Sequence, residues 1–148
     1  MLDFEEKALC RKVAGVFELS AINGYEPFNF ISTWLNSDTA MKLYQWDFKD
    51  IAQSKQYLLH SIEFEENLYE NEEKRNKEDK TTKAMYWFGY IIMYLSLDTK
   101  ISPKEIISTY DVVKIYMCYE TLHSLSSKNA VEEIEKNFHR LKANSKVH

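Results

Sequence analysis

The chain has 148 residues, of which 45% are hydrophobic and 28% are charged, and its formal net charge is −4. A chain of this length is expected to form one domain with a substantial core. The basic residues are not concentrated on one stretch, as the phosphate contacts of a nucleic-acid-binding protein require. No apolar run is long enough to span a membrane, and the acidic N-terminal residues do not resemble a signal peptide. We therefore expect a cytoplasmic protein without direct nucleic-acid or membrane contacts.

The amino-acid composition favours an all-α fold. Three glycines and two prolines are too few for the many turns of a sheet-rich protein. Apolar residues recur at spacings of three and four along most of the chain, as on one face of a helix. We predict a single helical domain over residues 1–148, built as a bundle of about six or seven helices.

The first three predicted helices follow from local start and stop signals. The first covers residues 4–21 and ends before Gly24, which suits the left-handed position after a helix. Pro27 is placed for the first turn of a second helix, where its missing N–H is not needed. An Asn-Ser-Asp run at 36–38 is typical of the cap of a short third helix.

A fourth helix and a charged connector complete the N-terminal half. The helix is predicted to begin at Asp47 or Asp50 and to run to about Asn67, with Phe64 toward the core. Residues at about 64–80 are too polar to bury much surface. We interpret them as a solvated connector, or a frayed helix end, that separates the two halves of the domain.

The most informative stretch is the run at 84–97, in which twelve of fourteen residues are apolar or aromatic. A helix that is apolar on nearly every side must be enclosed by protein or lipid. Fourteen helical residues span about 21 Å, which is shorter than the roughly 30 Å hydrocarbon core. The run therefore predicts the central helix of the bundle, capped by Thr81 or Thr82.

Three further helices are predicted after the central one. A Ser-Pro-Lys-Glu run at 102–105 combines a cap, a first-turn proline and a glutamate three residues after the cap. Asp111 begins the next helix, whose apolar stripe continues to Leu122. Ser126 or Ser127 begins the last helix, and a tail at 143–148 is expected to fray. The residues expected to face inward at the end of the last helix are Phe138 and Leu141.

Residues with catalytic or metal-binding chemistry are sparse. Cys10 and Cys118 lie far apart without a neighbouring histidine, so we expect two reduced, buried thiols and no zinc site. Glu120 and His123 have the Glu-x-x-His spacing of di-iron bundles, but a second copy is missing. We expect His123 to form a local hydrogen bond, and we expect no metal, no cofactor and no enzymatic activity. An unrecognised site remains an alternative if His60, Glu120 and His123 converge.

Two groups of residues are candidates for partner binding. Tyr86, Trp87, Tyr90 and Tyr94 recur at helical spacing, and they form either the core and its edge or a protein-binding patch. The acidic run is either a solvated stretch or an attraction for a basic partner. The acidic candidates are Glu65, Glu66, Glu70, Glu72 and Glu73.

Two stretches of the sequence resemble known bacterial proteins. The run Met85-Tyr-Trp-Phe-Gly-Tyr-Ile-Ile-Met-Tyr resembles a Tyr-Trp-x-Gly-Tyr-x-x-x-Tyr signature of small helical proteins that are often encoded near toxin–antitoxin modules. Ser102-Pro-Lys-Glu-Ile-Ile, residues 116–123 and Ala130-Val-Glu-Glu-Ile resemble a related short family encoded beside ADP-ribosyltransferase-like toxins. The resemblance covers about 84–138 and, more loosely, Phe30 to Trp46. The charged connector departs from it by being longer and more charged.

This resemblance implies a role that composition and spacing do not show. It implies a non-enzymatic antitoxin that binds a co-encoded toxin and covers its active cleft. The alternative from a different class is a phage-defence or counter-defence protein that binds a nucleic-acid enzyme through its acidic surface. The partner, the stoichiometry and the interface are left open by the sequence.

Overall fold

The computed structural model describes residues 1–66 and 79–141, and over these residues the predicted all-α, single-domain fold is confirmed. Helices account for 77% of the described residues, which contain no strand, and seven of the ten helices have at least seven residues. In chain order the helices are α1 (Phe4–Ile22), α2 (Pro27–Leu35), α3 (Asp38–Tyr44), α4 (Phe48–Ile51), α5 (Lys55–Glu66), α6 (Asp79–Thr99), α7 (Pro103–Thr109), α8 (Val112–Met117), α9 (Tyr119–Leu122) and α10 (Ser127–Asn137).

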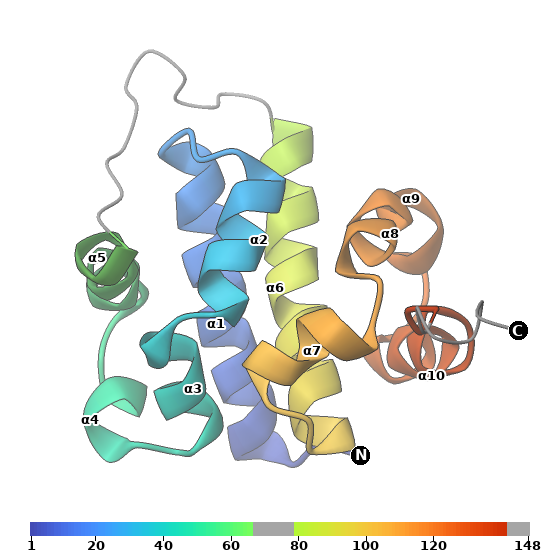
Figure 1. The fold of residues 1–148 in the computed structure, drawn as a ribbon, viewed down its shortest axis with the longest axis horizontal. Coiled ribbons are helices and arrows are strands. Elements are labelled where there is room, and N and C mark those ends of the chain that lie inside the picture. The colour runs from blue at the N-terminus through green and yellow to red at the C-terminus, as the bar shows by residue number, and fades with distance from the viewer. Residues whose placement is uncertain (67–78, 142–148) are drawn as a thin grey trace, which may run out of the picture.

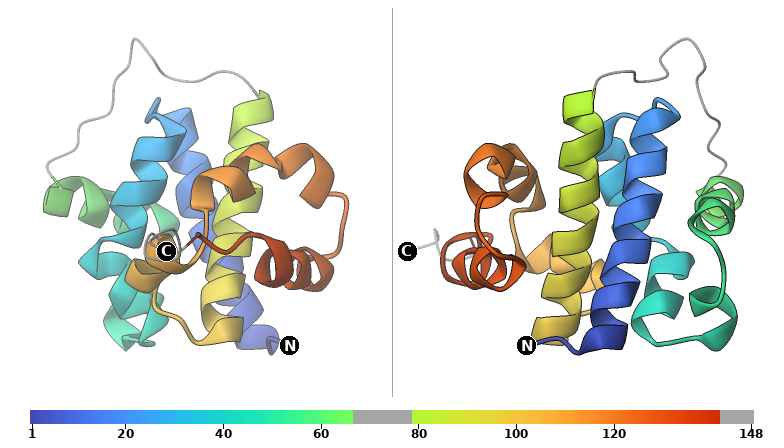
Figure 2. Two further views of the ribbon diagram at one scale, coloured as in Figure 1. Left: turned by 45° about the vertical axis from the view of Figure 1, so that its right-hand side comes forward. Right: turned by 180° about the vertical axis from the view of Figure 1, so that it is seen from behind.

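The two longest helices, α1 and α6, form the centre of the molecule. They lie side by side and run in opposite directions, as Figure 1 shows and the view from behind in Figure 2 confirms. Helices α3, α4 and α5 lie on one side of this pair and α8, α9 and α10 on the other, while α2 and α7 cover its front. Among the described residues no helix combines the length and the apolar character needed to cross a membrane.

The core is densest where α1, α2 and α6 meet around Phe17. Its ring centroid lies 5.2 Å from that of Phe30, 5.5 Å from Trp34 and 5.9 Å from Phe88, and all four side chains are at most 1% exposed. Such edge-on and tilted contacts suit aromatic rings. Gly89 allows α6 to approach this cluster, because a β-carbon there would lie 2.8 Å from Cγ of Phe17. The prediction that the run at 84–97 is the central helix is therefore confirmed.

Most of the predicted helix starts are confirmed by the capping hydrogen bonds. Pro27 and Pro103 occupy the first turns of α2 and α7. Side chains accept backbone N–H groups at four predicted caps, and Gly24, with φ of 88°, follows the end of α1 as expected. These four caps are Ser37 of α3, Ser102 of α7, Asp111 of α8 and Ser126 of α10.

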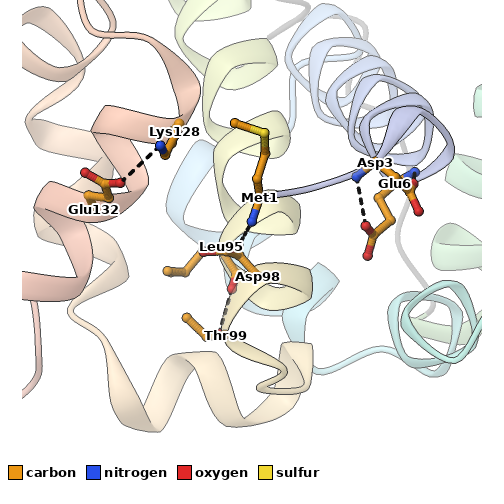
Figure 3. A network of polar contacts seen from close by, with 8 residues as sticks. All are labelled: Met1, Asp3, Glu6, Leu95, Asp98, Thr99, Lys128 and Glu132. Atoms are coloured by element: carbon orange, nitrogen blue, oxygen red, sulfur yellow. Dashed lines mark hydrogen bonds and ion pairs between the residues drawn. The ribbon is translucent and has the colours of Figure 1, made fainter.

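The start of α1 is held by a capping box whose sequence signal, an aspartate followed three residues later by a glutamate, was not among our predictions. Asp3 and Glu6 form a reciprocal capping box in which each side chain accepts the backbone N–H of the other. The amino group of Met1 lies 3.4 Å from the carboxylate of Asp98 near the end of α6 (Figure 3). These contacts join the beginning of α1 to the end of its central partner helix.

The predicted fourth helix is wrong as a single element, because it is divided into α4 and α5. Asp47 caps α4, which ends after four residues at Ile51. The hydroxyl of Ser54 then accepts the N–H of Tyr57 in the first turn of α5. Serine competes for backbone groups in this way at turns and helix starts, so the local hydrogen bond interrupts the helix.

Two other predicted boundaries also differ from the structure. Helix α6 begins at Asp79, so Thr81 and Thr82 lie inside it and are not caps. The helix predicted after Asp111 is interrupted at Cys118, whose N–H is shared between two carbonyl groups of the preceding turn. Such shared bonds are typical of helix ends.

Two side chains predicted to face inward are exposed. Phe64 is 91% exposed because α5 buries Leu58, Leu59 and Ile62, and a residue two positions beyond Ile62 falls on the opposite side of a helix. Leu141 is 84% exposed because α10 ends at residue 137. Beyond that point the helical spacing no longer applies, and the chain pairs with the segment between α7 and α8.

The pairing after α10 fixes the C-terminal part of the described chain. The N–H of Asp111 donates to the carbonyl of Phe138, and the N–H of Arg140 donates to the carbonyl of Thr109. Phe138 itself is 7% exposed, as predicted. The predicted connector begins within α5 and ends within α6, but residues 67–78 lie outside the described residues, as does the predicted tail at 143–148.

Candidate protein-binding surfaces

The four aromatic candidates on α6 do not form one surface. Tyr86 is 36% exposed, Trp87 and Tyr90 are half-buried, and Tyr94 is 2% exposed. The ring of Trp87 packs edge-on against Tyr119, with 5.5 Å between centroids. Tyr94 therefore belongs to the core and not to an exposed patch, while Tyr86 has the largest exposed fraction of the four.

Tyr90 lies where α6 meets the outer side of α1. Burial raises the pKa of its hydroxyl, the nearby Cys10 adds to this shift, and the charge of Arg11 opposes it. The guanidinium of Arg11 also lies 5.9 Å from the centroid of the Phe4 ring. Tyr90 is therefore close enough to Arg11 to be affected by its charge, and its ring lies 6.4 Å from that of Tyr94.

Glu65 has a structural partner that its sequence position does not reveal. Its carboxylate accepts the backbone N–H of Asp38 at 2.7 Å, and the N–H and hydroxyl of Thr39 at 3.3 and 2.5 Å. These groups lie at the start of α3, where backbone N–H groups lack helical partners. Glu65 thus caps α3 from the end of α5. Glu66 is exposed, and Glu70, Glu72 and Glu73 lie outside the described residues.

His60 belongs to a short chain of polar contacts that ties α5 to the loop after α1. Its Nδ1 lies 2.8 Å from Oε1 of Glu63, and Oε2 of Glu63 accepts the hydroxyl of Tyr25 at 2.5 Å. Glu63 is mostly buried, with 15% of its side chain exposed, whereas 78% of the His60 side chain is exposed. The carboxylate of Glu63 therefore orients both neighbours.

The residues proposed for an unrecognised catalytic site do not converge. His60 lies on α5, whereas Glu120 and His123 lie in and after α9 on the other side of the α1–α6 pair (Figure 1). Glu120 is paired with Lys80 at 3.2 Å. Nδ1 of His123 contacts the carbonyl of Tyr119 at 2.8 Å, which confirms the predicted local bond.

The cysteines and acidic groups show no metal-ligand geometry in the described part of the chain. No group of three or more histidine, cysteine, aspartate or glutamate side chains there is arranged to hold a metal ion. Both cysteines are free, and Cys118 is only partly buried. Burial raises the pKa of the Cys10 thiol to about 12, so this thiol stays protonated at neutral pH.

Two grooves lie on either side of the short helix α4. The first, which we call the α3–α5 groove, has a volume of about 410 Å³ and is lined by residues of α3, α4 and α5, including Asp50 of α4. The second, the α1–α4 groove, has a volume of about 250 Å³ and lies between α1 and the α3–α4 corner. Its walls are mainly apolar and include Leu9, Trp46 and Ile51.

Four exposed aromatic side chains accompany these grooves, and we call them the α4 aromatic group. Phe4 is 79% exposed and lines the α1–α4 groove, and Phe48 of α4 is 85% exposed. Tyr57 and Phe64 are 51% and 91% exposed and line the α3–α5 groove. Exposed aromatic side chains beside a groove are candidates for partner contacts, because aromatic residues are enriched at the centres of protein interfaces.

The sequence contained one signal for this group that we did not use. Phe64 stands between Glu63 and Glu65, and Phe48 lies between an aspartate and a lysine. An aromatic residue isolated among charged neighbours, away from the apolar stripe of its helix, is a candidate surface residue.

A third groove of about 230 Å³, lined by Ala84 and Met117 among others, lies between α6 and the α8–α9 segment.

Comparison of the chain with protein-family models, curated proteins and solved structures finds no match. The indications of function that remain are the chemistry of these surfaces and the resemblance of two stretches within 84–138.

Proposed function

We propose that this protein is a non-enzymatic protein-binding module that acts as an antitoxin, covering the active cleft of a co-encoded toxin. The observation that carries the binding role is the α4 aromatic group beside its two grooves. The antitoxin role rests on the sequence resemblance of the C-terminal half. The dispersed positions of the histidines support a binding role rather than catalysis.

The α4 aromatic group has the character of an interface centre. Aromatic side chains are enriched at the energetically dominant positions of protein interfaces. Removing an exposed phenylalanine ring from water contributes about 2 kcal/mol before the costs of association. On these terms Phe4, Phe48 and Phe64 together contribute about 6 kcal/mol, so a stable complex also needs contacts in the flanking grooves.

Co-expression with the product of the neighbouring gene tests the proposal. We expect the two proteins to purify as a complex and the toxin-inhibited cells to resume growth. The double variant Phe48→Ser/Phe64→Ser should lose the complex while its thermal stability stays unchanged, because both rings are more than four-fifths exposed. Leu141→Ser is the matched control, since Leu141 is 84% exposed but lies away from α4.

Several results would overturn the proposal. Absence of a complex and of growth rescue would exclude the antitoxin role. A complex unaffected by the double variant would exclude the α4 aromatic group as its interface, and Tyr86→Ala would then test the exposed part of α6.

The acidic surface offers the second candidate, a phage-defence or counter-defence protein that binds a nucleic-acid enzyme. Charge reversal tests it, and Glu65 must be left intact because it caps α3. Reversing Glu66, Glu70, Glu72 and Glu73 should abolish binding if the acidic run mimics a phosphate backbone. An interface made by the α4 aromatic group should retain most of its affinity, because exposed rim charges change association rate more than affinity.

A further inference from the structure

We propose that the α3–α5 groove is the recognition site for an arginine side chain presented by the protein partner. This inference rests on the proposed binding function and adds the chemistry of one contact. It follows from the charge, the exposed rings and the pairing state of the side chains that line the groove.

The groove carries an excess of negative charge. Asp38 of α3, Asp50 of α4 and Glu65 of α5 line it, against the single lysine Lys42, and His60 adds no formal charge when neutral. Glu65 is engaged with the start of α3. Within the described part of the chain, the side chains of Asp38 and Asp50 accept no hydrogen bond and form no ion pair.

Lys42 does not neutralise this charge. Its side chain is exposed and forms no ion pair with a carboxylate of the described residues, although Asp38 precedes it by four positions in α3. Two carboxylates that line one groove without a cationic partner create a potential that attracts a cation. Lys42 instead repels a cationic ligand. Replacing Lys42 by a neutral residue should therefore strengthen cation binding, whereas replacing the two aspartates should weaken it.

The aromatic side chains of the groove select the kind of cation. Phe64 is 91% exposed and Tyr57 is 51% exposed, so both ring faces are accessible to a ligand. A cation over an aromatic face is attracted by the ring quadrupole. Guanidinium combines this stacking with paired hydrogen bonds to a carboxylate, which an ammonium group does not provide. The combination of Asp38, Asp50 and the two rings therefore fits arginine.

The probe for this site is the tripeptide Gly-Arg-Gly with acetyl and amide ends, added to the isotope-labelled full chain and followed by amide NMR shifts. We expect saturable shifts confined to α3, α4 and α5. The same peptide with citrulline in place of arginine keeps the shape and loses the charge, and should leave these amides unshifted. The experiment does not depend on knowing the partner.

Variants of the groove give effects of opposite sign. Asp38→Asn/Asp50→Asn should weaken peptide binding about tenfold, since an exposed charge pair contributes a factor of up to about five. Lys42→Gln should tighten it about two- to fivefold by removing a like charge. Phe64→Ala should weaken binding without changing stability, because the ring is almost fully exposed. Glu132→Gln, on α10, is the control and should have no effect.

The inference is overturned if the arginine peptide gives no saturable shift, if the citrulline peptide binds equally well, or if Lys42→Gln weakens binding. Its failure is separable from that of the proposed function. A complex that survives Asp38→Asn/Asp50→Asn but not Phe48→Ser/Phe64→Ser would leave the binding module intact and refute the arginine site. Absence of any complex, with peptide binding retained, would refute the antitoxin role alone.

Discussion

Replacing Gly89 by alanine tests the packing of the central helix pair. In the middle of a helix, alanine is favoured over glycine by about 0.5–1 kcal/mol. A β-carbon on Gly89 would nevertheless lie 2.8 Å from Cγ of Phe17 and 2.9 Å from its Cβ and Cδ1. Rotation of the ring cannot relieve a contact with Cβ, and Phe17 is enclosed by Phe30, Trp34 and Phe88.

The two opposing effects set the expected magnitude. Overpacking a well-packed core costs about 1–3 kcal/mol, and the upper part of this range applies because α1 and α6 must separate. After the gain in helix propensity, Gly89→Ala should destabilise the protein by about 1–2 kcal/mol, lowering Tm by about 2–8 °C.

Gly15→Ala is the matched control within α1. Its β-carbon would lie 2.8 Å from Cδ of Lys55, a flexible side chain that can move aside. We therefore expect this variant to be unchanged or up to about 1 kcal/mol more stable than the parent. Urea unfolding followed by circular dichroism measures both values. The reasoning is refuted if Gly89→Ala is as stable as the parent, or if both variants lose the same stability.

Three further predictions concern stability. Glu65→Gln should lower the free energy of unfolding by about 1 kcal/mol, because it weakens the cap on α3, whereas Glu66→Gln should leave it unchanged. Equal losses of both variants in urea unfolding would contradict the capping role of Glu65. Trp87→Ala should lower the free energy of unfolding by about 1–3 kcal/mol and Phe88→Ala by about 3–5 kcal/mol, because the first ring is half-buried and the second fully buried. If Trp87→Ala instead abolishes partner binding at unchanged stability, Trp87 is an interface residue. Burial raises the pKa of Cys10 from 9.0 to about 12, so the folded state keeps a proton that the unfolded state releases, and stability should fall as pH rises from 9 towards 12. Burial also raises the pKa values of two buried tyrosines, Tyr94 and Tyr110, and two half-buried ones, Tyr90 and Tyr116, which act in the same direction. A urea unfolding midpoint that is constant between neutral and alkaline pH would contradict this.

The sequence resemblance and the structural indication of a binding surface lie mainly in different parts of the chain. The resemblance covers about 84–138 and, more loosely, Phe30 to Trp46. The strongest structural indication of a binding surface lies in the N-terminal half, around α4.

The sequence by itself determined the helical class and most helix starts. Caps such as Ser102 with Glu105, and first-turn prolines such as Pro27, act through hydrogen bonds and dihedral angles within one turn, so they can be recognised without tertiary information. The burial of the run at 84–97 was also predictable, because a helix that is apolar on nearly all sides has to be enclosed.

Only the tertiary structure decided which faces of the weaker helices are buried and which polar groups are used internally. Leu141 follows the helical spacing of the last helix in the sequence, yet α10 ends at residue 137 and leaves this side chain exposed. Glu65 serves as the cap of a helix that begins 27 residues earlier in the chain. Such contacts depend on how distant segments pack, whereas helical periodicity describes only neighbours within a few residues. The grooves beside the α4 aromatic group could therefore be identified only from the tertiary structure.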